Sequence, residues 1–510
     1  MLSTTYTIAL NGVEGSVIET QTDISAGFPS FTVIGLADTA VQEARERLKS
    51  GIKNSNVSFP STKRILINLA PADVRKEGPG YDLSMAVGVL TSELKINYDF
   101  ASAIFFGELN LNGTLRHTSG VLAVAVSAAA RGFKELFVPA INAREAALVK
   151  GITIIPVASL VELIAHLKKE KNISPSTPTK IAVLCANKRH DKESGDMSIV
   201  QGQSFAKRAL EIAASGGHNV LLSGPPGSGK TMLAKAMATI LPVPQENEII
   251  EITKIYSVAG LLPPEKIIIH ERPFRAPHHS ASLVSLVGGG SRLRPGEISL
   301  AHRGVLFLDE FPEFSRATLE SLRQPLEDGY ITISRASGTV RFPARFTLVA
   351  SQNPCPCGFW SDPEKPCTCT PIQIHNYQRK ISGPLLDRID LYVEVPRANA
   401  QELLANNTQT ETSEKIRTRV ENARTQQTKR FAGTTLACNA DMGAEEIKKW
   451  CVLDEHCTTL LTRAISTLRL SARAVSRVLK TARTIADLEN ARNIQMHHLA
   501  ESLQYRPQKE

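Results

Sequence analysis

The stretch GPPGSGKT, residues 224–231, constrains the fold more than any other part of the chain. It follows the apolar run NVLLS and precedes TMLAKAMATIL, a helical pattern. The pattern G-x-x-x-x-G-K-[ST] between a strand and a helix is typical of a loop whose backbone N–H groups surround phosphates. We therefore predict an α/β unit that binds ATP. The residues expected at the nucleotide are Gly224, Pro225, Pro226, Gly227, Ser228, Gly229, Lys230 and Thr231.

Two acids in GVLFLDE, residues 304–310, supply the expected partner of this loop. An apolar run of this kind indicates a buried strand, with Asp309 and Glu310 at its carboxyl end. Lys230 would neutralise the β- and γ-phosphates, and Thr231 and Asp309 would hold Mg²⁺. Glu310 would polarise the attacking water. The alternative is an apolar strand that ends in two solvated acids.

Further polar residues follow along the chain. The run RFTLVASQNP ends near Asn353, which we expect to sense the γ-phosphate or orient the water. Arg388 follows an amphipathic turn and is expected at an exposed surface, where in a ring-forming ATPase it would enter a neighbour's site. Arg473 and Arg477 share one helix face because they are four residues apart. Arg473 is predicted to reach the nucleotide, and Arg477 to form a structural salt bridge.

Half of the eight cysteines lie in NPCPCGFWSDPEKPCTCT, residues 353–370. Cys355, Cys357, Cys367 and Cys369 match the ligand number of a structural Zn²⁺ site, although C-x-C is tighter than the usual spacing. We favour zinc over packing without a ligand and over a redox switch. Cys451 and Cys457 fit buried apolar positions better than ligand positions. His278 and His279 are expected on opposite faces of an extended strand, in a structural role.

The length and net charge of the chain limit the number of its domains and the class of its partner. A chain of 510 residues is too long for one core. The net charge of +9 favours a polyanionic partner. No apolar run is long enough to span a bilayer, and the N-terminus lacks a secretory signal, so we expect a cytoplasmic protein without a membrane partner. The changes in apolar and polar pattern along the sequence predict an α/β unit over 1–168, a linker over 169–198, an α/β core over 199–395 and a helical lid over 396–510.

Residues 199–510 resemble an AAA+ ATPase, with five motifs in the expected order. The segment VQGQ, which ends at Gln203, looks like the segment that cradles adenine in that superfamily. RPFRAPHHSASLVSLVGGGSRLRPGEISLAHRG resembles a helix-2 insert, and LRQPLEDGYITISRASGTVRFPARFTLVAS resembles a hairpin before sensor 1. Both are features of the branch that includes the magnesium-chelatase and MCM motors.

The N-terminal unit is similar to the Lon-protease domain but lacks its catalytic pair. The resemblance lies in KEGPGYDLSMAVG and GTLRHTSGVLAVAVSAAARGFKELFVP. Gly80 stands at the position of the nucleophilic serine, and Leu122 near that of the lysine. Neither side chain offers a nucleophile or a titratable amine, so we expect a scaffold or a DNA-guiding ring and no protease.

Taken together, nearly the whole chain resembles the YifB/ComM family. That resemblance implies a homohexameric, ATP-driven DNA helicase that promotes branch migration during natural transformation. It places candidate DNA contacts at Arg335, Arg292 and Arg294, which would bind the backbone without reading sequence. Two other readings stay open: a magnesium-chelatase-type motor that remodels a protein partner, and a protein-unfolding ATPase or assembly factor.

Overall fold

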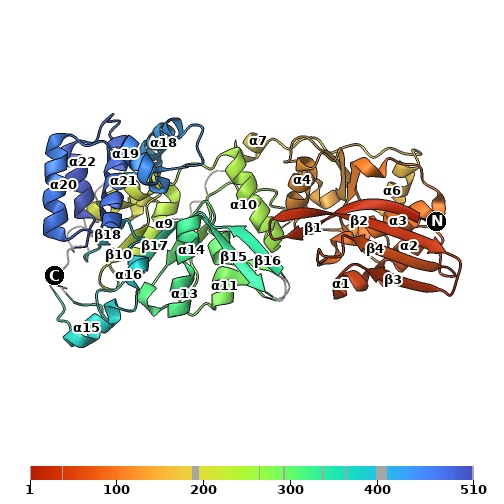
Figure 1. Ribbon diagram of the computed structural model, residues 1–510, viewed down its shortest axis with the longest axis horizontal. Helices are drawn as coiled ribbons and strands as arrows, with labels where there is room; N and C mark the ends of the chain where they lie inside the picture. The colour runs from red at the N-terminus through yellow and green to blue at the C-terminus, as the bar shows by residue number, and fades with distance from the viewer. Residues whose placement is uncertain are drawn as a thin grey trace.

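The computed structural model describes residues 2–36, 38–186, 195–263, 265–290, 293–335, 338–360, 362, 364–397 and 411–507. The described residues form a mixed α/β protein with two main sheets and a helical C-terminal region. Figure 1 shows these parts in chain order along the long axis: the N-terminal unit at one end, the central unit next to it, and the C-terminal helices at the other end.

The N-terminal unit contains a seven-stranded mixed sheet in the order β3-β4-β2-β1-β5-β8-β9. Side chains alternate between buried and less buried positions along β4, as expected for a sheet with one face on a core. The strands are β1 (Leu2–Asn11), β2 (Glu14–Ser25), β3 (Ser30–Ile34), β4 (Arg64–Ala70), β5 (Ala103–Phe105), β8 (Glu135–Pro139) and β9 (Thr153–Val157), with a small ribbon of β6 (Glu108–Leu109) and β7 (Leu115–Arg116).

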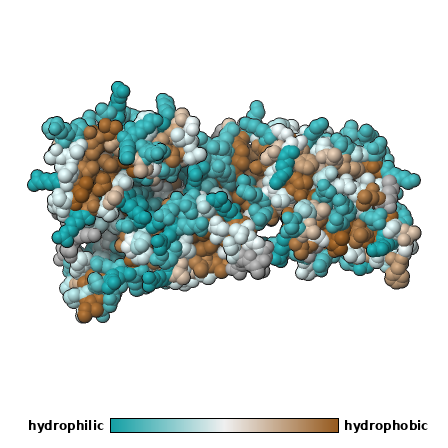
Figure 2. Space-filling model, in the orientation of Figure 1, coloured by the Kyte–Doolittle hydropathy of each residue, from teal (hydrophilic) through white to brown (hydrophobic). Residues whose placement is uncertain are grey.

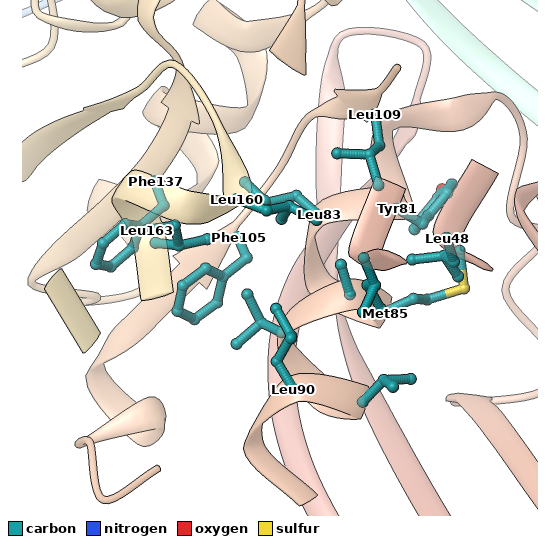
Figure 3. Close-up of a cluster of buried hydrophobic side chains, with 14 of the residues drawn as sticks. Leu48, Tyr81, Leu83, Met85, Leu90, Phe105, Leu109, Phe137, Leu160 and Leu163 are labelled. Carbon is teal, nitrogen blue, oxygen red and sulfur yellow. The ribbon is translucent and has the colours of Figure 1, made fainter. Parts of the chain in front are cut away.

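The core of this unit forms around α3 (Asp82–Leu94), whose residues 82–92 are all buried. Figure 3 shows side chains from α3 among residues of the sheet and of neighbouring helices. The rings of Phe105 and Phe137 stack with their centroids 4.6 Å apart. A helix that is buried all round needs cover on every side, and the strands β1 and β2 provide most of it for α3. The others are α1 (Thr39–Gln42), α2 (Ala44–Asn54), α4 (Val121–Ala130), α5 (Ala143–Ala146) and α6 (Leu160–Leu167).

The central unit contains a five-stranded sheet in the order β11-β14-β17-β10-β18, and every pair in it is parallel. The strands are β10 (Val220–Ser223), β11 (Phe274–Arg275), β14 (Val305–Leu308), β17 (Thr347–Gln352) and β18 (Leu391–Glu394). β10, β14 and β17 are apolar and almost fully buried, as parallel strands covered on both faces must be. Their carboxyl ends therefore meet at one edge of the sheet.

Helices and two antiparallel ribbons surround this sheet. The helices are α8 (Ser204–Gly216), α9 (Lys230–Ile240), α10 (Glu246–Ala259), α11 (Leu283–Val287), α12 (Glu297–Leu300), α13 (Arg316–Ser321), α14 (Arg323–Asp328), α15 (Pro371–Gln378) and α16 (Gly383–Leu386). The ribbons are β12 (Gly288–Gly289) with β13 (Arg294–Pro295), and β15 (Tyr330–Arg335) with β16 (Gly338–Pro343).

The C-terminal region is helical, as the sequence predicted. Its helices are α18 (Ser413–Arg430), α19 (Ala444–Trp450), α20 (Glu455–Leu468), α21 (Ala472–Leu488) and α22 (Met496–Gln504). The region is tied to α8 by two ion pairs, Arg208 with Glu501 at 2.8 Å and Arg419 with Glu211 at 2.5 Å. The apolar patch within the expected linker forms α7 (Ile181–Ala186), and Ile181 is buried beside Leu122 and Ile249.

The N-terminal unit packs directly on the central unit. The turn between β1 and β2 places Val13 in the same buried cluster as Val340 of β16. Beside it, Asn11 donates a hydrogen bond to the carbonyl of Thr339 at 3.5 Å. Helix α4 lies against α10. Beside this contact, Ser257 of α10 donates a hydrogen bond to the buried carboxylate of Glu145 of α5 at 2.5 Å. In Figure 1 the ends of β1 and β2 meet α10 and the β15–β16 hairpin.

Polar side chains cover most of the face in Figure 2, with an apolar stripe over the C-terminal helices. Among the described residues, every helix is too short or too polar to cross a bilayer.

Candidate nucleotide-binding site

The expected phosphate-binding loop lies at the carboxyl edge of the central sheet. β10 ends at Ser223 and α9 begins at Lys230, so residues 224–229 join a central strand to the start of a helix. A side chain at position 224 would clash with the carbonyl oxygen of Val395, and Gly229 has a φ of 90°. Only glycine satisfies both conditions without strain. The loop therefore has the tight backbone and helix N-terminus that bind phosphate.

Lys230 points back into this loop. Its Nζ donates to the carbonyl oxygens of Gly224 at 2.7 Å and Pro225 at 2.9 Å, and to Oδ1 of Asn353 at 3.3 Å. Burial lowers the pKa of Lys230, while Asp309 and Glu310 act in the opposite direction. The ammonium group is thus positioned where the loop would receive phosphate oxygens.

A hydroxyl and a carboxylate meet beside the loop, at the ends of α9 and β14. Thr231 donates from Oγ1 to Oδ2 of Asp309 at 2.9 Å. The other oxygen of Asp309 accepts hydrogen bonds from the hydroxyl of Ser351 and from the N–H of Glu310, the latter at 3.1 Å. Hard oxygen ligands of this kind suit Mg²⁺, which would keep waters and phosphate oxygens as its remaining ligands. The predicted magnesium pair is therefore brought together.

Glu310 stands next to Asp309 in a left-handed conformation, with a φ of 53°. This backbone turn separates its side chain from that of Asp309, and its carboxylate lies 3.0 Å from Nδ1 of His279. The rings of His278 and His279 lie 4.1 Å apart, in a coil and turn. The expectation that they occupy opposite faces of a strand was therefore wrong. The contact of His279 with Glu310 had no signal in the sequence.

Two further expected residues lie around the loop. Asn353 directly follows β17 and contacts Lys230, as described above. Gln203 precedes α8 with a φ of 55° and donates from Nε2 to the carbonyl of Pro396 at 2.6 Å. Pro396 follows Val395, whose carbonyl oxygen lies close to Gly224, so Gln203 is anchored beside the loop.

Arg388 does not lie exposed, which corrects the expectation from the sequence. Only 6% of it is accessible. Its guanidinium pairs with Glu327 of α14 and donates to the carbonyl of Pro384 at 2.5 Å, while Nε is buried without a hydrogen-bond partner among the described residues. The acid on α14, which is distant in sequence, explains why a local reading of GPLLDRIDL failed.

The two arginines of α21 differ in their surroundings. Arg473 is exposed in the first turn, and among the described residues no hydrogen bond joins it to the phosphate-binding loop. Arg477 forms an ion pair with Asp390, which is buried just before β18. The salt bridge expected of Arg477 is present.

A basic cavity of about 850 Å³ lies at the opposite edge of the central sheet. Asn219, Gly304 and Thr347, at the amino ends of β10, β14 and β17, form part of its wall. The cations that line it are Arg272, Arg303, Arg345, Arg388, Arg424, Arg477 and Lys480. Arg388 thus belongs to the edge of the sheet that faces away from the phosphate-binding loop of its own chain.

The other candidates are only partly placed. The sulfurs of Cys355, Cys357, Cys367 and Cys369 gather within 4.8 Å of one another. Arg294 is exposed in β13, Arg335 ends β15 without a described side chain, and Arg292 lies outside the described residues.

Comparison with known proteins agrees with this arrangement. Residues 196–403 match the family model for magnesium chelatase, subunit ChlI. Residues 20–142 match a model for subunit ChlI of Mg-chelatase, and residues 410–506 match the model for its C-terminal part. The parallel sheet with its phosphate-binding loop and the helical C-terminal region are consistent with an AAA+ fold of the magnesium-chelatase type.

Individual relatives match over very different lengths. The magnesium-chelatase 38 kDa subunit of Rhodobacter capsulatus is 30% identical over 176 residues, 31% of this chain and 49% of that protein. Competence protein ComM of Haemophilus influenzae is 41% identical over 509 residues, 99% of this chain and 97% of that protein. The uncharacterized protein YifB of Escherichia coli is 41% identical over 506 residues, with the same coverage. With likeness over nearly the full length of both, this chain belongs to the YifB/ComM family of magnesium-chelatase-like proteins.

Proposed function

We propose that this chain is an ATP-hydrolysing DNA motor that forms a homohexameric ring and drives branch migration in homologous recombination during natural transformation. The observation that carries the ATPase is the meeting of Lys230, Thr231, Asp309 and Glu310 at one sheet edge. The setting in competence is supported by the likeness to competence protein ComM over 99% of the chain.

Within one subunit, the chain's residues divide the work of phosphoryl transfer. The loop N–H groups and Lys230 would bind the phosphates, and Thr231 and Asp309 would hold Mg²⁺, which neutralises phosphate charge. Glu310 would accept the proton of the attacking water, with His279 fixing its carboxylate at 3.0 Å. Asn353, which accepts a hydrogen bond from Lys230 and follows β17, would sense the γ-phosphate or orient the water.

Between subunits, the two edges of the central sheet would meet. In a head-to-tail ring each interface pairs two different surfaces of the subunit, and here these would be the amino edge of one sheet and the carboxyl edge of the next. Arg388 lies at that amino edge, beside the basic cavity. We propose that assembly draws Arg388 away from Glu327 and toward the neighbour's nucleotide, where a cation stabilises the transition state. Arg473 remains a candidate for contact with the nucleotide from the lid.

DNA would pass along the loops and the N-terminal unit. Arg335, Arg292 and Arg294 are proposed to contact its phosphates without reading sequence. The N-terminal unit is proposed to be a Lon-like domain without protease chemistry. A side chain at Gly80 would lie 2.5 Å from the ring of Phe106, and Leu122 is fully buried, so a nucleophile and a lysine have no place there.

The test is ATP-dependent three- or four-strand branch migration with the purified full chain. Lys230→Ala is expected to remove nucleotide binding, and Glu310→Gln to leave nucleotide bound but hydrolysed far more slowly. Arg463→Ala, an exposed arginine of α20, is the control and should keep full activity. Branch migration that persists in both site variants would refute the mechanism.

A second candidate is a magnesium-chelatase-type motor that remodels a protein partner. The match to the 38 kDa subunit of magnesium chelatase over 176 residues favours it. Stimulation of the ATPase by DNA separates the two candidates. A rate that rises with branched or single-stranded DNA, and falls steeply with salt, supports the DNA motor. A rate indifferent to DNA supports the second candidate.

A further inference from the structure

The four cysteines of the 353–370 loop converge although they come from its two ends. Sγ of Cys355 lies 3.3 Å from that of Cys357 and 3.7 Å from that of Cys367, and the sulfurs of Cys357 and Cys367 are 3.5 Å apart. Cys369 completes the group within 4.8 Å. All four are free thiols, with separations much longer than a disulfide bond of about 2.05 Å.

These separations are those of a metal tetrahedron. Zn²⁺ binds thiolates at about 2.3 Å, which places the sulfurs of a tetrahedral site about 3.8 Å apart. Four soft thiolate ligands in this geometry select zinc, or iron of a similar radius, over the hard cations Mg²⁺ and Ca²⁺. The site has no open ligand position, so its role would be structural and not catalytic.

Backbone donors surround the sulfurs, as they do around metal-bound thiolates. The N–H of Trp360 donates to Sγ of Cys355 at 3.3 Å, and that of Cys369 to Sγ of Cys367 at 3.4 Å. Such second contacts orient the ligands and stabilise their negative charge. Cys355 is fully buried, whereas the other three cysteines are partly exposed and leave a path for the ion.

The loop contacts the nucleotide site directly. Gly358 has a φ of 85°, and a side chain there would lie 2.6 Å from Cδ of Pro226 in the phosphate-binding loop and 3.8 Å from the side-chain amide of Asn353. On its other side the loop is held by Arg397, whose Nε lies 3.1 Å from the carboxylate of Asp362 and whose guanidinium stands 5.4 Å from the centre of the Phe359 ring. Arg397 follows Pro396, which anchors Gln203.

We propose that Cys355, Cys357, Cys367 and Cys369 bind one Zn²⁺, and that this metal makes the loop a rigid brace for the phosphate-binding loop. The loop would then connect the end of β17 to the segment after β18, while Gly358 packs beside Pro226 and Asn353. The loop lacks regular secondary structure in its described residues, so side-chain cross-links must supply its rigidity. Metal binding supplies folding free energy to such segments. Zinc at this site therefore sets the affinity for ATP without touching the nucleotide.

The first measurement is the metal content of the purified full chain by mass spectrometry of the elements. We expect one zinc per chain, and loss of that zinc in the double variant Cys367→Ser/Cys369→Ser. Cys451→Ala, a buried cysteine of the C-terminal region, is the control and should keep its zinc. Cobalt exchanged for zinc should give the charge-transfer and d–d absorption of a tetrahedral tetrathiolate, and the double variant should lose it.

The second measurement is the affinity for a fluorescent ATP analogue, without DNA. The double variant is expected to bind it roughly tenfold or more weakly, because small displacements of a positioning element carry large costs. Gly358→Ala should keep its zinc and still bind the analogue more weakly, since the new methyl group meets Pro226. Lys230→Ala should also keep its zinc while losing nucleotide, so failure of the nucleotide site is distinguishable from failure of the metal site.

The outcomes separate the two parts of the proposal. Purified protein with little zinc, with iron in its place, or with disulfides in the loop overturns the zinc site. Zinc at one per chain with unchanged analogue affinity in both the double variant and Gly358→Ala overturns the brace. Because neither measurement involves DNA, their results test the zinc site and the brace independently of the proposed branch migration.

Discussion

Asp309 is the residue on which the geometry of the nucleotide site converges. It lies at the end of β14 and accepts hydrogen bonds from Thr231, from Ser351 and from the backbone of Glu310. Ser351 comes from the neighbouring strand β17, two residues before Asn353. Its hydroxyl fixes one carboxylate oxygen, which leaves the other oriented toward Thr231 and the expected magnesium position.

Ser351→Ala should therefore weaken the binding of Mg²⁺ while leaving the nucleotide loop in place. We expect the Mg²⁺ concentration for half-maximal ATPase activity to rise about tenfold, as for other residues that orient a metal ligand. Ser321→Ala is the matched control, since among the described residues that hydroxyl bonds to its own helix, at the carbonyl of Thr318. An unchanged Mg²⁺ requirement in Ser351→Ala would show that Asp309 is oriented without this serine.

At the residue scale, the sequence allowed residues within one motif to be predicted, but not the contacts between residues of different motifs. Lys230, Thr231 and Asp309 were predictable because each lies at a fixed position relative to a strand or helix end. His279 and Ser351 stand at no such motif position, because only the folded structure brings them to Glu310 and Asp309. The burial of Arg388 depends in the same way on an acid of α14.

At the scale of elements, an ion pair with a buried carboxylate attaches the C-terminal helices to the central sheet. Asp390 precedes β18 and pairs with Arg477 of α21, and the imidazole of His218 lies 3.7 Å away. Its backbone carbonyl accepts a hydrogen bond from Arg506, near the end of the described chain. Burial by itself would raise the pKa of Asp390, but the charge of Arg477 and the contact with the imidazole of His218 outweigh it and hold that pKa well below its usual range.

The stability of this attachment should depend on pH with a definite sign. Because the pKa of Asp390 is lower in the folded protein than in the unfolded chain, its ionised form stabilises the fold above about pH 4, and this contribution is lost as the pH falls toward the folded value. Asp390→Asn should lower the free energy of unfolding by about 1–3 kcal/mol at pH 7, since it leaves the half-buried guanidinium of Arg477 without its charged partner.

The measurement is urea unfolding of both proteins from pH 3 to pH 8, followed by circular dichroism. The difference between them should shrink below about pH 4, where Asp390 begins to lose its charge in the unfolded reference. Asp328→Asn, an exposed acid of α14, should show no such difference. A constant difference at every pH would assign the effect of Asp390→Asn to packing and not to charge.

The elements themselves were predictable where their apolar pattern is regular. The C-terminal segments EEIKKWC, HCTTLLTRAISTLRL, ARAVSRVLKTARTIADLE and MHHLAESLQ correspond to α19, α20, α21 and α22. By contrast, α18 lies within a stretch that reads as polar, because its buried face includes Ser413 and Gln427 as well as aliphatic residues. Its helical structure depends on contacts with α8 and α9, which a single segment does not reveal.

At the scale of the whole molecule, the residues proposed to act in hydrolysis lie at the two opposite edges of the central sheet. The phosphate-binding loop lies at the carboxyl edge and Arg388 at the amino edge. One subunit therefore cannot bring its own Arg388 to its own nucleotide without rebuilding the sheet. The proposed ring, in which a site is shared between two subunits, would use both the loop and Arg388.

Mixing two inactive variants tests this division. Lys230→Ala lacks a working loop and Arg388→Ala lacks the arginine, and each should be inactive alone. In rings assembled at random from equal amounts, about a quarter of the interfaces combine an intact loop with an intact arginine, so about a quarter of the ATPase rate should return if Arg388 acts in trans.

Glu327→Gln is the control for the mixing experiment, because it frees Arg388 without removing it. That variant should keep its ATPase activity and need no partner variant. No recovery of activity in the mixed rings would place the role of Arg388 within its own subunit.

The turn between β1 and β2 has a consequence for how this protein is divided in the laboratory. Val13 shares a buried cluster with Leu306 and Leu348, which belong to strands of the nucleotide-binding sheet. A fragment that starts after the linker keeps every phosphate-binding residue but exposes the surface that Val13 covers. The predicted linker at residues 169–198 is thus not a boundary of the hydrophobic core, and a fragment cut there would lose part of the apolar cover of the nucleotide-binding sheet.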